Sequence, residues 1–170
     1  MRSRNFLIVI LLLGSMACTT AAERIGQIEQ LEIAMFDKDK KFDEDIARDL
    51  MGDYEQFAEE FPEHEMAPEF LDRAANIARQ LKEYERGLEN YQTIVVRYPD
   101  FEKIIETKFL IAFMYDVELK NKEKAEEKYK AVAEQYPDHV FGKNAKDRLV
   151  TLHMSDEELI EFFNQKNSRQ

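Results

Sequence analysis

The chain has 170 residues, of which 44% are hydrophobic and 35% charged, a balance typical of one helical globular domain. Glycine and proline are scarce, with five and four residues, while alanine, glutamate, leucine and lysine are plentiful, so the composition favours helix nearly throughout. The net charge of −11 argues against a nucleic-acid groove, because phosphate binding depends on clustered lysine and arginine.

Residues 1–17 have the pattern of a secretory signal peptide. Arg2 and Arg4 precede an uninterrupted apolar run over 6–13, and small or modest side chains follow it up to Cys18. The run is too short to span a membrane, which takes about 20 apolar residues. Cleavage after this segment removes two arginines and no acids, so the exported part is more acidic still.

Cys18 is the chain's single cysteine, so no disulfide can form within the chain. The stretch LLLGSMAC resembles the lipobox of bacterial lipoproteins, although Ser15 and Met16 depart from the family's preferred residues. The resemblance implies that acyl chains on Cys18 anchor the protein. With no aspartate after Cys18, it also implies an outer-membrane location facing the periplasm. The alternative is a plain cleaved signal with an incidental cysteine.

The anchored segment 18–41 is expected to contain one degenerate capping helix, near residues 23–36. The repeats then occupy 42–152, beginning with an apolar stripe along 42–61 that predicts the second helix of a first hairpin. An aromatic-proline pair recurs eight residues after a tyrosine, with a period of 37 and then 38. The three sets are Tyr54 with Phe61-Pro62, Tyr91 with Tyr98-Pro99, and Tyr129 with Tyr136-Pro137.

Between the second and third sets the spacing predicts helical hairpins. First helices are expected over about 66–82 and 103–119, each with an apolar, partly small face. Gly87 and Ala125 mark the positions where a second helix crosses closest to its partner. A proline disfavours helical geometry in the residue before it, so Pro99 ends one hairpin, and Asp100 is expected to cap the next.

These residues resemble tetratricopeptide repeats. The resemblance rests on a small residue in each first helix (Ala74, Ala112), a small residue opening each second helix, an aromatic four residues later, and the closing proline. It implies an all-α, TPR-like solenoid of about two and a half helical hairpins with capping helices. Behind a lipobox, the pattern is similar to bacterial cell-envelope lipoproteins, including the helical-repeat component of outer-membrane barrel assembly and the repeat domain of a periplasmic cell-division coordinator.

The C-terminal part, 153–170, is expected to be a capping helix followed by a polar tail. It comes after a closing helix over 139–152, and it opens with Ser155 and Glu158, which have the spacing of a capping box.

The sequence carries no recognisable catalytic or metal-binding constellation. His64-Glu65 begins like the HExxH zinc motif, but Pro68 stands where the second histidine is required. His64 and His139 are interpreted as solvated loop residues. The paired acids are interpreted as helix surface. The interpretation is therefore of a non-enzyme without cofactor or metal.

Two function classes follow. The favoured one is a lipid-anchored scaffold that binds another envelope protein or peptide segment in the groove of its stacked hairpins. The alternative is a periplasmic binding subunit for a glycan, a cell-wall fragment or a small solute, which aromatic side chains exposed in the groove would favour. Arg73, Asn76 and Arg79 are the polar residues of the first helices that the core pattern leaves free, and they are the predicted partner-binding residues.

Overall fold

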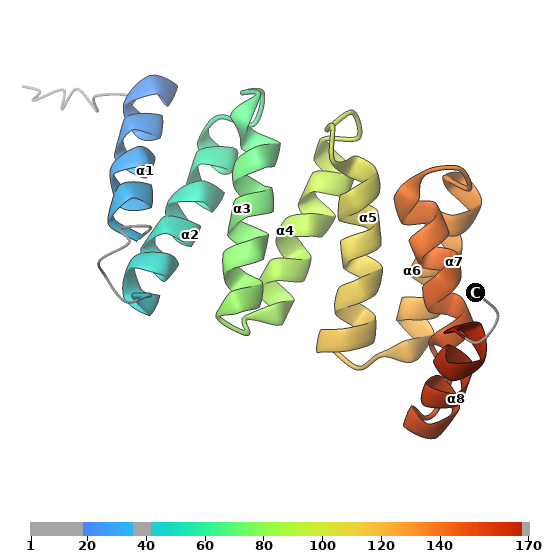
Figure 1. Cartoon of the computed structure of the whole chain (residues 1–170). Coiled ribbons are helices and arrows are strands. Elements are labelled where there is room, and N and C mark those ends of the chain that lie inside the picture. Colours follow the sequence, from blue (N-terminus) through green and yellow to red (C-terminus); the bar gives the residue numbers. More distant parts are fainter. Residues whose placement is uncertain (1–18, 36–41, 168–170) are drawn as a thin grey trace, which may run out of the picture.

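The computed structural model describes residues 19–35 and 42–167, which form helices joined by short turns and contain no strand (Figure 1). The predicted signal peptide and Cys18 lie outside these described residues. The helices in chain order are α1 (Ala21–Met35), α2 (Glu44–Glu60), α3 (Met66–Gln80), α4 (Tyr84–Arg97), α5 (Ile104–Phe113), the π-helical turn η1 (Met114–Glu118), α6 (Lys122–Gln135), α7 (Val140–Thr151) and α8 (Asp156–Asn167).

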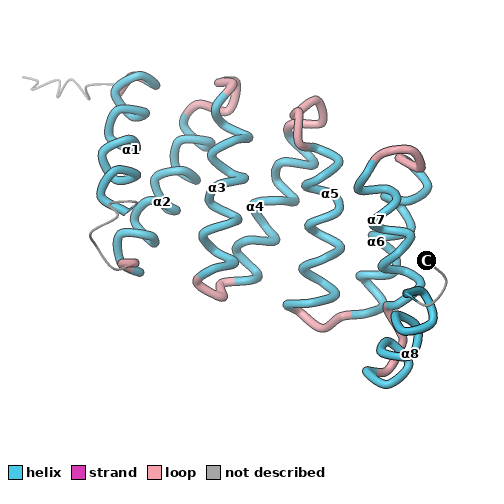
Figure 2. The backbone as a smooth tube through the Cα atoms, viewed as in Figure 1, coloured by secondary structure: helices cyan, strands magenta, loops and turns pink. Residues whose placement is uncertain are grey.

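The helices stack as antiparallel hairpins. Each of α1 to α6 packs against the next helix in the chain, and α7 returns to pack against both α6 and α5. The turns alternate between the two ends of the stack (Figure 2). We call α1, α3, α5 and α7 the first helices and α2, α4 and α6 the second helices. The prediction of an all-α, TPR-like solenoid is confirmed.

The core is continuous because α3 contributes to two neighbouring hydrophobic clusters. Phe70, Ala74 and Ile77 pack toward α1 and α2, while Leu71 and Ala75 pack toward the following repeats. Residues three and four apart in a helix share a face, so the first set forms one face of α3 and the second set forms another. Helix α3 therefore joins the two clusters into one core.

Small residues lie where the two helices of a hairpin pack together. A Cβ added to Gly87 would lie 3.2 Å from the carbonyl oxygen of Ala75 and 3.3 Å from Cε of Met114. Ala125, one repeat later, is fully buried. A larger side chain at either position would separate the two helices of the hairpin.

The aromatic-proline pairs end the second helices. Phe61, Tyr98 and Tyr136 have φ near −130° and ψ between 55° and 60°, outside helical geometry, yet each backbone N–H still donates to the carbonyl four residues earlier. Proline cannot extend that ladder, since it lacks the N–H. The predicted role of the repeated motif as a helix stop is confirmed.

The prediction that Asp100 caps the next helix is wrong, although the helix does begin close to the predicted residue 103. Helix α5 begins at Ile104, its N-cap Lys103 makes no side-chain cap, and the backbone bond from Ile104 to the Phe101 carbonyl opens the first turn. The two histidines that follow the other prolines do act at helix starts. The Nδ1 atom of His64 accepts from the Met66 N–H at 3.1 Å, and that of His139 accepts from the Phe141 N–H at 3.3 Å. Their interpretation as solvated loop residues therefore missed a local structural role.

In the α3–α4 and α5–α6 hairpins the turn uses a lysine in the left-handed region. Lys82 has φ of 62° and Lys120 has φ of 53°, at positions 38 residues apart in the repeat. After α5, the N–H of Asn121 reaches the Tyr115 carbonyl at 2.7 Å, across the turn that follows η1. This is the type of C-terminal cap in which glycine is usually found.

The two ends of the stack are thinly packed. In α1 the buried residue is Ile28, against α2. In α8 the predicted capping box is present: Ser155 Oγ accepts from the Glu158 N–H at 3.2 Å, and Glu158 accepts from the Ser155 N–H at 2.8 Å. No α8 side chain that the structure describes is buried. None of the helices in the described ranges is long and apolar enough to span a membrane.

Candidate partner-binding surface

The three repeat tyrosines tie the second helices to the first. Tyr54, Tyr91 and Tyr129 are at most 2% exposed. Their hydroxyls donate to Glu32 at 2.5 Å, Asn76 at 3.1 Å and Asp116 at 3.3 Å, respectively. Burial raises the pKa of Tyr91 and of Tyr129 to about 12, and burial together with the Glu32 carboxylate raises that of Tyr54 further. The hydroxyls therefore remain donors over the physiological range.

Ion pairs join each first helix to its neighbour. Arg73 of α3 lies 2.6 Å from Glu32 of α1, Arg79 of α3 lies 2.9 Å from Glu118 of η1, and Arg148 of α7 lies 2.6 Å from Asp116 of η1. We call these three pairs the arginine ladder. The π-helical turn η1 supplies two of the three acids in the ladder. Glu118 pairs with α3, and Asp116 pairs with α7 on the other side. Turns of this kind often interrupt α-helices at functional sites.

Arg73, Asn76 and Arg79 lie outside the core, as the pattern predicts, but all three side chains have partners within the protein. Besides the two ladder pairs, the side-chain amide of Asn76 donates to the Asp72 carbonyl at 2.8 Å and accepts the Tyr91 hydroxyl. The sequence pattern placed these residues outside the core correctly, but it did not show that their partners lie on neighbouring helices. Their role in partner binding stays a prediction.

The structure brings two of the three predicted residues together. Arg73 and Asn76 line a hollow of about 320 Å³ that also includes residues of α1 and α2, with the Tyr54 side chain among its walls. Arg79 lies toward α5 instead. The side chain of Arg73 remains 40% exposed and that of Arg79 22%, so both retain surface that a partner can contact.

Sequence reasoning missed the centre of this surface. The Phe113 ring lies beneath two guanidinium groups, with Cζ of Arg79 at 5.7 Å and Cζ of Arg148 at 5.4 Å from its centroid. Arginine over an aromatic face is a favourable arrangement. No local motif marks it, because the three residues come from three different helices.

A lysine adds a further link between α3 and the segment before α5. Lys103 Nζ lies 2.7 Å from Glu69 and 3.5 Å from Asp72. Burial raises the pKa of Asp72, and the lysine counteracts that rise. The first-helix side of the molecule is thus lined by paired charges of both signs.

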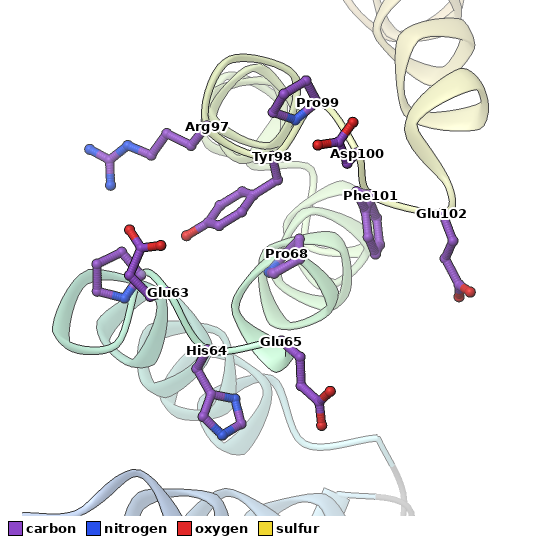
Figure 3. A pocket seen from close by; sticks show the side chains of 11 residues that line it. Glu63, His64, Glu65, Pro68, Arg97, Tyr98, Pro99, Asp100, Phe101 and Glu102 are labelled. Carbon is purple, nitrogen blue, oxygen red and sulfur yellow. The ribbon is translucent and has the colours of Figure 1, made fainter.

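A second hollow lies at the end of the stack where the repeats join (Figure 3). Its volume is about 710 Å³. Figure 3 shows the Tyr98 side chain pointing toward Glu63, and the Tyr98 hydroxyl is buried without a hydrogen-bond partner among the described residues. The lining combines rings and carboxylates from the two turns: Pro62, Glu63, His64, Glu65, Pro68, Arg97, Tyr98, Pro99, Asp100, Phe101 and Glu102.

Neither hollow gathers the ligands of a metal site among the residues that the structure describes. Among the described residues, no group of three or more His, Cys, Asp or Glu side chains could hold a metal ion. His64 serves a helix start, and Nε2 of His153 lies 3.0 Å from Glu126 on an exposed surface. The arrangement can offer hydrogen bonds and complementary charge to a ligand.

Comparison with known proteins agrees with the fold. A family model described as tetratricopeptide repeat matches residues 106–139, which run from α5 through α6 to the turn before α7. No curated protein matches the chain significantly. The match covers one repeat, and together with the stacked hairpins it supports a TPR-like helical-repeat fold.

Proposed function

We propose that the chain is a non-catalytic scaffold that binds a protein or peptide segment along its first helices. Tetratricopeptide repeats generally mediate protein–protein interaction. The observation that carries the proposal is the charged arginine ladder across α3, η1 and α7. Of the large hydrophobic side chains exposed on the described first helices, Ile33, Val140 and Val150, none is aromatic. Since these exposed side chains offer no aromatic face for a sugar ring to stack on, the first helices favour a protein or peptide ligand.

The setting we propose is the bacterial cell envelope. Acyl chains on Cys18 would hold the repeats at the outer membrane, facing the periplasm, after cleavage of residues 1–17. The partner would then be another envelope protein or a peptide segment of one, and the scaffold would serve envelope or outer-membrane assembly. The lipobox-like stretch and the resemblance to envelope lipoproteins of this repeat class support this setting.

One observation favours the alternative, a binding subunit for a glycan, cell-wall fragment or small solute. The hollow in Figure 3 combines the rings of Tyr98 and Phe101 with several carboxylates, a mixture that suits sugars. Calorimetric titration with soluble cell-wall fragments tests it. Binding that Phe101→Ala abolishes would favour the alternative, and absence of heat would favour the scaffold.

The scaffold proposal calls for a variant that reverses surface charge without breaking the ladder. The Arg79–Glu118 pair suits this better than the other two, because Glu32 and Asp116 accept a tyrosine hydroxyl whereas Glu118 pairs with Arg79, although Arg79 also contacts Tyr91 and Phe113. We expect Arg79→Glu combined with Glu118→Arg to retain the pair in reverse and to melt closer to wild type than Arg79→Glu alone. A matched control on a second helix is Glu126→Lys with Lys130→Glu, which reverses a pair 2.6 Å apart on α6.

The measurement is capture of partners from detergent-solubilised envelopes with the lipidated protein. The Arg79/Glu118 reversal is expected to lose proteins that the wild type and the α6 control both retain. If both reversed pairs recover the same proteins as the wild type, the first helices are not the binding surface.

A further inference from the structure

An apolar groove lies between α4, α5 and α6, and none of its lining residues belongs to the arginine ladder. Its volume is about 380 Å³. Val96 at its edge is 79% exposed, more than any other large hydrophobic side chain in the described ranges. The lining residues are Val95, Val96, Ile111, Ala131 and Val132, with Gln92, Lys108, Lys128 and Gln135 at the polar positions.

The charge of this groove is opposite to that of the chain. The whole protein carries −11, yet the residues that line the groove include two lysines and no acid. Lys108 is held in place by Tyr136 at 2.7 Å and Gln135 at 3.1 Å, which are both uncharged. Lys128 lies 2.9 Å from Glu127, which is outside the lining. The groove therefore suits an aliphatic side chain flanked by carboxylates.

The corresponding groove one repeat earlier does not share these properties. There Asn90 and Thr93 stand 38 residues before Lys128 and Ala131, and the space holds an ion network. Arg86 Nη2 donates to Glu55 at 2.6 Å, and Asn90 donates to Glu55 at 2.7 Å. The earlier groove satisfies its own polar groups, so the apolar, cationic lining is particular to the α4–α6 groove.

Helix α8 has the complementary chemistry. Its first turn is acidic, and Glu157, Ile160 and Glu161 lie three and four residues apart, so they share one face. Ile160 is 62% exposed. Figure 1 shows α8 extending beyond the end of α6 and α7 rather than lying against the stack. On α8 the aliphatic side chain of Ile160 is thus flanked by the carboxylates of Glu157 and Glu161, and the lining of the groove contains no carboxylate.

We propose that α8 of a second copy docks in the α4–α6 groove. Ile160 enters the apolar lining beside Val96, while Glu157 and Glu161 approach Lys108 and Lys128. The contact is heterologous, because the groove and the helix lie at different places on the molecule. Two copies can form a dimer if each places its α8 in the groove of the other; otherwise successive copies form an open oligomer. The contact leaves the arginine ladder open, so self-association and partner binding use different surfaces.

Disulfide trapping between two different copies tests the contact even if it is weak. All variants carry Cys18→Ser in the full-length chain. One copy carries Asn164→Cys, on the same face of α8 as Ile160, and the other carries Gln92→Cys or Gln135→Cys at the groove. The matched control is Glu59→Cys, an exposed residue at the corresponding groove one repeat earlier.

At least one groove cysteine is expected to cross-link to Asn164→Cys roughly tenfold faster than the control, because docking raises the local thiol concentration. Val96→Glu or Ile160→Glu should remove that excess. Lys128→Glu should slow the reaction, and Glu157→Lys with Glu161→Lys on the other copy should restore it. Rates equal to the control, or an excess that survives Val96→Glu, would overturn the proposal. These rates do not depend on partner capture, so this proposal and the scaffold function fail separately.

Discussion

Among the glycines that the structure describes, Gly142 has the least space for an added methyl group, so Gly142→Ala is a sensitive test of how α7 packs. A Cβ at this position would lie 1.7 Å from the carbonyl oxygen of Tyr136 and 2.7 Å from its carbonyl carbon. Both obstacles are backbone atoms, so α7 or the proline turn must move by more than 1 Å to reach an ordinary contact of about 3.4 Å. Overpacking of a buried site costs about 1–3 kcal/mol and more when the backbone must shift. Alanine regains up to about 1 kcal/mol of helix propensity. We therefore expect Gly142→Ala to lower the free energy of unfolding by roughly 2–3 kcal/mol.

The matched control is Gly52→Ala in the middle of α2, where a Cβ would meet nothing within 4 Å. There the propensity gain is unopposed, so the control is expected to be about 0.5–1 kcal/mol more stable than wild type. Urea denaturation followed by circular dichroism measures both, and opposite shifts in the midpoint are expected. Equal shifts, or a stabilised Gly142→Ala, would show that α7 does not approach the Tyr136 carbonyl.

Three further predictions concern turns, buried tyrosines and anchoring. Lys120→Gly should raise the free energy of unfolding by up to about 1 kcal/mol, because φ of 53° is strained for lysine; no gain in urea denaturation would argue against the left-handed turn. In the folded protein the pKa values of Tyr91 and Tyr129 are about 12, against an ordinary value of 10. The contribution of their protonated hydroxyls to the free energy of unfolding is therefore complete below pH 10 and is lost as the pH rises toward 12. About two units correspond to roughly 2–3 kcal/mol for each tyrosine, and Tyr91→Phe should make stability less steep in that window; an unchanged slope would contradict the burial of its hydroxyl. Cys18→Ser should leave the precursor uncleaved or release the protein from the membrane without changing the helical repeats; a mature variant that still fractionates with outer membranes would contradict the lipid anchor.

The fold followed from short-range features of the sequence. The 38-residue spacing, the small residues at Gly87 and Ala125, and the aromatic-proline stops were enough to predict the hairpins and their order. The capping box of Ser155 and Glu158 was predictable for the same reason, since both partners lie within one turn. The helix stops and caps depend on neighbouring residues and backbone rules, and the 38-residue repeat shows which of them recur.

The candidate site was less predictable because its contacts join distant parts of the chain. Arg79 pairs with an acid 39 residues later, and the direction of that side chain depends on the π-helical turn η1. The start of α5 was predicted to within one residue, but its cap was not, because an aspartate after a proline was assumed to cap, whereas a backbone bond to Phe101 opens the helix. Charged residues outside an apolar stripe were treated as free, although neighbouring repeats supply their partners.

Site-specific photo-cross-linking in living cells tests the central claim, that the first helices bind a protein partner. A photoreactive amino acid would replace Gln80, an exposed residue of α3 beside the Arg73 hollow, or Glu89, an exposed residue of the second helix α4. The account predicts that irradiation links a discrete envelope protein through position 80 and leaves position 89 unlinked. A partner linked through position 89 alone, or no protein linked through position 80, would contradict it.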